Sequence, residues 1–152
     1  MNPRRFFTQP SPPDVGSIRD LQAEGPGGPI ALRMYHSLSH ASNEPLPVPV
    51  YYHGGGFVIG DLDTHDVLCR ELANASGYAV VAVDYRLALE HPFPAAVIDC
   101  VAATKWVHRQ ASAFGLDASR MAVGGDGAGG NSRPLSASWR AAKVARRSAF
   151  SC

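Results

Sequence analysis

The hydrophobic positions along the chain change their spacing several times, and each change predicts a different element. Residues 17–22, 30–35 and 48–52 have the alternating or β-branched pattern of short strands. Glycine and proline at 25–28 separate the first two strands, which predicts a turn between them. Residues 78–83 form a continuous apolar run, as in a strand that is buried on both faces of a parallel sheet.

Two longer segments carry helical periodicity between these strands. The first begins at Asp63 or Thr64 as the capping residue, runs to about Ala75 and is stopped by Gly77. The second covers 94–109, and a last strand follows at 120–123. Strands and helices that alternate in this way predict the α/β class, with a mostly parallel sheet and helices on both of its faces.

Composition limits what such a domain can do. The 152 residues (16.1 kDa) suit one domain, and 45% hydrophobic residues permit a core. The net charge of +1 argues against a nucleic-acid partner. No run approaches the about 18 apolar residues of a membrane span, and no secretory signal is visible. Cys69, Cys100 and Cys152 are too few and too scattered for a disulfide framework or a metal site, so we expect reduced thiols in a cytoplasmic protein without a metal.

A run of three glycines follows the predicted strand at 48–52. His53 precedes Gly54, Gly55 and Gly56, and Phe57 closes the run, which we call the glycine loop (residues 53–57). Successive glycines let backbone N–H groups point outward and let a substrate approach closely, as an oxyanion hole requires. The alternative is a plain tight turn, which needs fewer glycines. We interpret His53 as a residue that orients the loop rather than as a catalytic base.

A second glycine cluster follows the last predicted strand, at 124–130. It formally matches the dinucleotide-binding pattern G-x-G-x-x-G. That pattern needs an acidic residue about 20 positions later for the ribose, and no acidic residue follows Asp126. We therefore expect no dinucleotide and no other cofactor.

Four blocks together resemble the hormone-sensitive lipase branch of the α/β-hydrolases. They are H-G-G-G-F at 53–57, D-Y-R-L-A at 84–88, E-H-P-F-P-A at 90–95 and G-G-D-G-A-G-G-N at 124–131, in the family's order and spacing. The resemblance covers roughly 18–131. It implies a serine esterase or lipase fold, a small-molecule carboxylic ester as the substrate, and often a short acyl chain.

The resemblance also implies roles for single residues. Gly55, Gly56 and the N–H of Ala128 match the oxyanion hole, with His53 and Gly54 orienting the loop. Gly127 stands at the nucleophile position of the elbow motif G-x-S-x-G, where the family has serine. A glycine tolerates the strained elbow but has no hydroxyl to attack a carbonyl. A further departure is Leu89, where the family usually has proline.

The family's catalytic acid and histidine lie downstream of the elbow. No acid and no histidine follows Gly127 in this sequence. We therefore expect the family's ester hydrolysis to be lost in a chain truncated after the elbow. The alternatives are a non-catalytic ligand-binding or interaction fragment, or the product of a disrupted gene without a function.

The charge pattern divides the chain further. All 13 acidic residues lie at or before Asp126, whereas 132–152 carries five basic residues and no acid. We expect a remnant of an N-terminal cap segment at 1–16, a partial α/β-hydrolase core at 17–131 and a frameshifted tail at 132–152. A genuine basic tail is the alternative.

Overall fold

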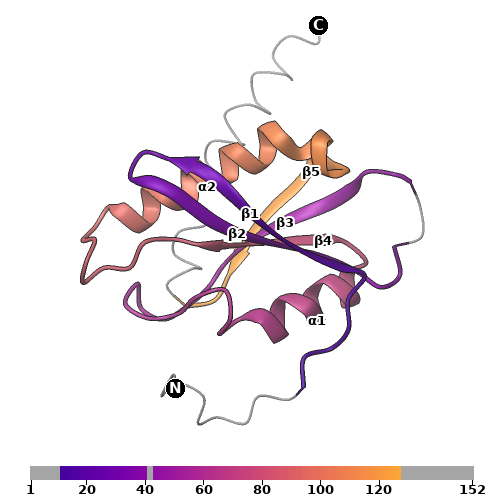
Figure 1. The fold of residues 1–152 in the computed structure, drawn as a ribbon, viewed down its shortest axis with the longest axis horizontal. Helices are drawn as coiled ribbons and strands as arrows, with labels where there is room; N and C mark the ends of the chain where they lie inside the picture. The colour runs from indigo at the N-terminus through magenta and orange to yellow at the C-terminus, as the bar shows by residue number, and fades with distance from the viewer. Residues whose placement is uncertain (1–10, 41–42, 128–152) are drawn as a thin grey trace, which may run out of the picture.

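A computed structural model describes residues 11–40 and 43–127, which form one five-stranded sheet with a helix on each face (Figure 1). The strand order is β1-β2-β4-β3-β5. The strands are β1 (Ser17–Gly25), β2 (Gly28–His36), β3 (Leu46–Tyr52), β4 (Ala79–Asp84) and β5 (Leu116–Gly125). Strand β3 pairs in parallel with both β4 and β5, whereas β2 pairs antiparallel with β1 and β4. The predicted α/β class is confirmed, with a mixed sheet.

The two helices lie on opposite faces of the sheet, α1 (Asp66–Ser76) on one and α2 (Ala95–Gln110) on the other (Figure 1). A 3₁₀ turn, η1 (Ala111–Phe114), joins α2 to β5. Neighbouring strand residues point to opposite faces. Tyr52 therefore packs in the core under α2, and Tyr51 packs in the core under α1. Both faces are thus buried, which explains the continuous apolar run of β4.

The turn at 25–28 and the end of α1 agree with the sequence-based predictions. Gly25 pairs with Gly28 where β1 meets β2. Gly77 adopts φ 72° and its N–H bonds the Ala73 carbonyl at 2.9 Å, which ends α1. A left-handed residue at this position suits glycine.

The predicted start of α1 is wrong by one or two residues, because the capping residue is His65 rather than Asp63 or Thr64. Thr64 does not begin a helix, because it closes a turn with Asp61 instead. The Thr64 N–H donates to Asp61 Oδ1 at 2.8 Å, and the Asp61 N–H donates to Thr64 Oγ1 at 2.9 Å. The helix begins at Asp66. Strand β5 also begins earlier than the expected 120, at Leu116, with an irregularity in its pairing beside Pro47 and Val48.

Neither a membrane-spanning helix nor a metal-binding group of side chains is found in the described residues. None of the helices in 11–40 and 43–127 is long and apolar enough to cross a membrane. In the same ranges no group of three or more histidine, cysteine, aspartate or glutamate side chains could hold a metal ion. The tail at 132–152 and Cys152 lie outside the described residues.

Candidate active site

The glycine loop leaves the carboxyl end of β3 and turns sharply. Gly55 has φ 120° and Gly56 has φ 64°, both in the region that favours glycine. The N–H groups of Val58 and Ile59 both bond the Gly55 carbonyl at 3.1 Å. A Cβ on Gly55 would collide with the backbone carbonyl of Ile59. This turn therefore requires glycine at position 55, because a larger residue there would have a strained backbone and would collide with Ile59.

His53 lies beneath the loop and is 3% exposed. Its ring stacks on Tyr85 with centroids 4.3 Å apart, and its Nδ1 lies 2.8 Å from the Gly54 carbonyl. Tyr85 donates its hydroxyl proton to the His53 carbonyl at 2.5 Å. Burial lowers the pKa of His53, which favours the neutral ring. In the neutral ring, Nδ1–H donates to the loop's own Gly54 carbonyl.

Asp126 joins the elbow (residues 125–129) to the glycine loop. Its Oδ1 accepts the Gly54 N–H at 2.8 Å and the Tyr51 hydroxyl at 2.5 Å. A Cβ on Gly54 would collide with Asp126 Oδ2, so glycine permits this close approach. Burial alone would raise the pKa of Asp126, but the hydrogen bonds from Tyr51 and Gly54 outweigh it and lower the pKa. The carboxylate therefore stays ionised and holds the two segments together.

Gly127 lies directly beside the loop. It has φ 47°, and a Cβ built on it would lie 3.7 Å from the Gly54 Cα, an ordinary van der Waals distance. The structure therefore brings Gly127 together with Gly54. Ala128, the third expected donor of the oxyanion hole, lies outside the described residues.

Contacts from α2 support the loop from the other side. Phe57 adopts φ 64°, and its carbonyl accepts the Ala88 N–H at 2.6 Å. Two residues before Ala88, Arg86 forms a bidentate ion pair with Asp99 of α2, with N–O distances of 2.9 Å. Asp99 is 1% exposed and also accepts the Arg86 N–H at 3.0 Å. The D-Y-R-L-A block thus links helix α2 to the glycine loop.

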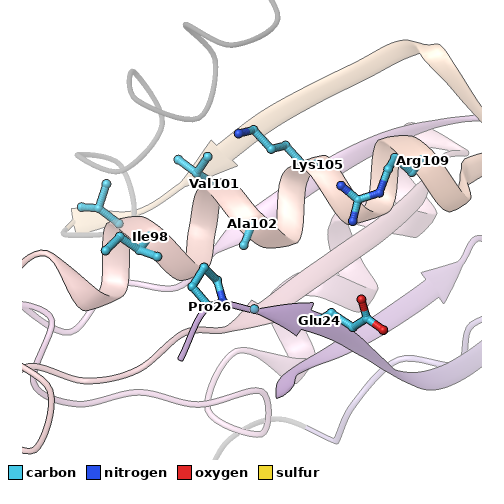
Figure 2. A pocket seen from close by; sticks show the side chains of 9 residues that line it. Glu24, Pro26, Ile98, Val101, Ala102, Lys105 and Arg109 are labelled. Atoms are coloured by element: carbon cyan, nitrogen blue, oxygen red, sulfur yellow. The ribbon is translucent and has the colours of Figure 1, made fainter. Parts of the chain in front are cut away.

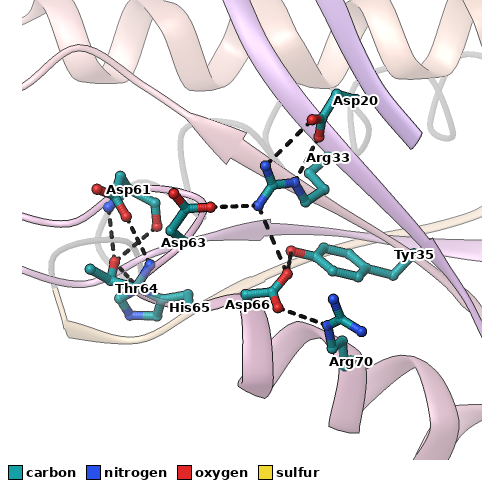
Figure 3. Close-up of polar contacts among 9 residues, drawn as sticks. All are labelled: Asp20, Arg33, Tyr35, Asp61, Asp63, Thr64, His65, Asp66 and Arg70. Carbon is teal, nitrogen blue, oxygen red and sulfur yellow. Dashed lines mark hydrogen bonds and ion pairs between the residues drawn. The ribbon is translucent and has the colours of Figure 1, made fainter. Parts of the chain in front are cut away.

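On the opposite face, a polar network fixes the start of α1 (Figure 3). Arg33 of β2 bonds Asp20 at 2.7 Å and Asp63 at 2.8 Å. Asp66 accepts the Tyr35 hydroxyl at 2.9 Å. It also pairs with Arg70 Nε at 2.7 Å, one helical turn later (Figure 3). This network holds in place the residue before Asp66, which is His65.

His65 points toward the elbow. Its Nε2 lies 3.5 Å from Asp126 Oδ2, and its ring centroid lies 5.5 Å from that of His53 and 6.2 Å from that of Tyr51. The sequence patterns do not point to Asp126, Tyr51 or His65 as site residues. The position of Asp126 directly before Gly127 was the one available signal.

The groove in Figure 2 lies apart from this site. It has a volume of about 510 Å³ and runs between the β1–β2 turn and the outer side of α2. Glu24 and Pro26 line it on one side, and Val101 and Lys105 line it on the other. It shares no residue with the glycine loop.

Comparisons with known proteins agree with this geometry. A family model described as alpha/beta hydrolase fold matches residues 49–144. Esterase LipI of Mycobacterium tuberculosis is 50% identical over 122 residues, which are 80% of this chain and 38% of that protein. The arylesterase of Saccharolobus solfataricus is 35% identical over 117 residues, which are 77% of this chain and 37% of that protein.

The same likeness is found in solved structures. A hyperthermophilic esterase from Pyrobaculum calidifontis superposes with a TM-score of 0.80 at 47% identity, over 86% of this chain and 41% of that one. The chain therefore spans about two fifths of the length of these similar proteins.

Proposed function

This chain belongs to the α/β-hydrolase fold family, in its hormone-sensitive lipase branch, and on that premise we propose that it forms the oxyanion-binding part of a carboxylic ester hydrolase site. The observation that carries the proposal is the bond from the Gly54 N–H to Asp126 at 2.8 Å, which holds the glycine loop against the elbow. The substrate class that we propose is a small carboxylic ester with a short acyl chain. No cofactor takes part.

In this proposal the glycine loop stabilises the negative charge that develops on the carbonyl oxygen of the ester. As the carbonyl carbon is attacked, its oxygen becomes negative and accepts hydrogen bonds from the N–H groups of Gly55, Gly56 and Ala128. Preorganised donors of this kind lower the barrier because they need not reorient during the reaction. His53 and Gly54 contribute by orienting the loop rather than by contacting the oxygen.

We further propose that the chain with Gly127 does not itself hydrolyse esters. A complete site attacks with a hydroxyl at this position and needs a histidine to take the proton. Gly127 supplies no hydroxyl, so no acyl intermediate can form there. What remains is binding of the ester and polarisation of its carbonyl.

A pair of chimeras separates these two proposals. Residues 17–127 of this chain would replace the matching segment of esterase LipI, once with Gly127 and once with Gly127→Ser. We expect the serine chimera to hydrolyse p-nitrophenyl butyrate. We expect the glycine chimera to be slower by about a millionfold, the usual cost of losing the nucleophile. A folded serine chimera without turnover would contradict the proposed oxyanion role, and turnover by the glycine chimera would contradict the proposed inactivity.

Gly127 also supports a second candidate, a non-catalytic fragment that binds a ligand or a partner. In that case the 152-residue chain accumulates in cells as soluble protein and binds a short-chain ester without turnover. Failure to detect the protein would favour the product of a disrupted gene. Cell fractionation in the same experiment tests the cytoplasmic localisation that we propose.

The frameshifted tail at 132–152 is likewise a proposal, supported by its five basic residues and lack of acids. The family model also matches 132–144, which supports the alternative of a genuine tail. Resequencing the gene past codon 131 decides between them. A single missing base supports the frameshift, and an unchanged reading frame contradicts it.

A further inference from the structure

The groove on the outer side of α2 has no role in the function proposed so far (Figure 2). It has a volume of about 510 Å³ and lies between α2 and the β1–β2 turn. Sites for small molecules are typically mostly apolar hollows of about 300–1,000 Å³ with a few polar groups. The groove therefore has the size of a small-molecule site, and its lining indicates which kind of molecule would fit.

The first half of the groove is apolar. Val97 and Val101 line it one helical turn apart, and so do Ile98 and Ala102. Ile98 is 39% exposed, although the opposite face of α2 is the one that packs in the core. A helix that covers one face of a sheet normally carries polar residues on its outer side. This half of the groove therefore favours an apolar ligand segment.

The second half of the groove is basic. Lys105 and Arg109 line it further along α2, and Glu24 lines the same end from β1 (Figure 2). Two positive charges and one negative charge leave this end with a net positive charge. Within residues 11–40 and 43–127, neither Lys105 nor Arg109 forms an ion pair with an acidic side chain. This end therefore favours an anionic ligand group.

The order of these groups along α2 fits an unbranched carboxylate. From Ile98 to Arg109 the helix rises by about 16 Å, and an extended medium-chain fatty acid spans much of this length. Its acyl chain would lie on the apolar residues and its carboxylate beside Lys105 and Arg109. The chain's own residues 132–152 suit this end poorly, because they carry five basic residues and no acid.

We propose that the groove on the outer side of α2 binds a free medium-chain fatty acid, with its carboxylate between Lys105 and Arg109. The groove shares no residue with the glycine loop. The proposal therefore does not rest on the proposed ester function, and ester turnover by the chimeras does not bear on it.

Titration of the ¹⁵N-labelled 152-residue chain with decanoate tests this proposal. We expect the amide signals of Ile98 and Ala102 to shift with a common Kd on the order of 0.1 mM, typical of a small ligand in an open site. Octanoate should bind about four- to fifteenfold more weakly, because it buries two methylenes fewer. Equal Kd values for the two acids, or no shifts at these amides, would overturn the proposal.

Helix α1 supplies an internal control in the same spectra. Its Leu68 and Leu72 are 37% and 38% exposed, about as much as Ile98. The arginine between them, Arg70, is already paired with Asp66 at 2.7 Å. We therefore expect the amides of Leu68 and Leu72 not to shift. Shifts there as large as those in α2 would show unspecific binding to apolar surface and would overturn the proposal.

Charge variants test the basic end. Lys105→Gln and Arg109→Gln should each raise the Kd of decanoate about two- to fivefold, the range for partly exposed ion pairs. Arg120→Gln, which removes an exposed arginine outside the groove, should leave it unchanged. Decyltrimethylammonium has the same chain and the opposite charge, and it should bind the wild type about tenfold more weakly than decanoate. Equal affinities for these two probes would overturn the proposal even if a variant failed to fold.

Other occupants of the groove would give different results. A second copy of this chain would give a dimer in sedimentation velocity that decanoate does not dissociate. A lipid surface would give binding to phosphatidylglycerol vesicles without any shifts by free decanoate. We expect a monomer that binds decanoate and does not bind the vesicles, and either of the other results would overturn the proposal.

Discussion

Replacing Asp99 by asparagine tests whether helix α2 supports the glycine loop. Asp99 accepts three hydrogen bonds from Arg86, from the backbone N–H at 3.0 Å and from Nε and Nη2 at 2.9 Å each. Asparagine keeps the shape but removes the charge and turns one acceptor oxygen into a donor that faces the guanidinium. The Ala88 N–H, which bonds the Phe57 carbonyl at 2.6 Å, lies on the same segment as Arg86. Loss of the ion pair should therefore loosen the loop as well.

The burial of the pair sets the size of the effect. Hydrogen bonds to charged groups contribute about 1.5–3 kcal/mol, and breaking a fully buried ion pair costs about 3–5 kcal/mol. The Asp99 side chain is 2% exposed, but that of Arg86 is 27% exposed, so water partly rehydrates the guanidinium. We therefore expect Asp99→Asn to lower the free energy of unfolding by about 2–3 kcal/mol. With a urea m-value of about 2 kcal/mol/M, the unfolding midpoint falls by about 1–1.5 M.

Equilibrium urea unfolding followed by tryptophan fluorescence measures this change. Asp117→Asn is the matched control, because Asp117 also pairs with an arginine, at 2.6 Å, but the Arg120 side chain is 53% exposed. We expect the control to move the midpoint little, since exposed pairs contribute little to stability. Equal shifts in the two variants would refute the argument that the buried pair anchors the loop.

The remaining predictions concern the loop and the elbow. Gly54→Ala should lower the midpoint of urea unfolding, because its Cβ would collide with Asp126, whereas Gly124→Ala meets no atom within 4 Å and should be nearly neutral; equal effects would contradict the packing. Folding lowers the pKa of Asp126, so its contribution to stability is complete above the unfolded-state value of about 4 and is lost as the pH falls through the folded-state value. The difference in unfolding free energy between the wild type and Asp126→Asn should therefore shrink as the pH falls below about 4; a constant difference would contradict this. Gly127→Ser in the 152-residue chain should not raise p-nitrophenyl ester turnover above that of Gly127→Ala, because serine is a weak nucleophile at neutral pH without an adjacent base.

The elements of this fold could be predicted from local patterns in the sequence. The glycine and proline cluster at 25–28 predicts the β1–β2 turn, and Gly77 predicts the end of α1. The start of α1 could not be predicted in this way, because Thr64 can cap a helix or close a turn with Asp61 equally well by composition. The contact between Asp63 and Arg33 of β2 favours the turn. Such a tertiary contact is not visible in a local pattern.

The site could be predicted only in part. The glycine loop can be predicted because three consecutive glycines after a strand are more than a plain tight turn needs. Asp126 and His65 come from segments that lie about 60 residues apart in the sequence, and periodicity does not show that the two residues meet. The parallel pairing of β3 with β5 brings Asp126 beside the glycine loop. Its contact with His65 also depends on where α1 begins.

Labelling with an organophosphonate ester tests whether this chain carries a nucleophile that can attack an ester. The 152-residue chain would be treated with the probe and its intact mass measured, with a full-length esterase of the family as the positive control. Because Gly127 has no hydroxyl at the nucleophile position, we expect the esterase to gain one adduct and this chain to gain none. A single adduct on this chain, mapped to Ser132 or to any other serine, would show a substitute nucleophile and would contradict the proposal that the chain binds esters without hydrolysing them.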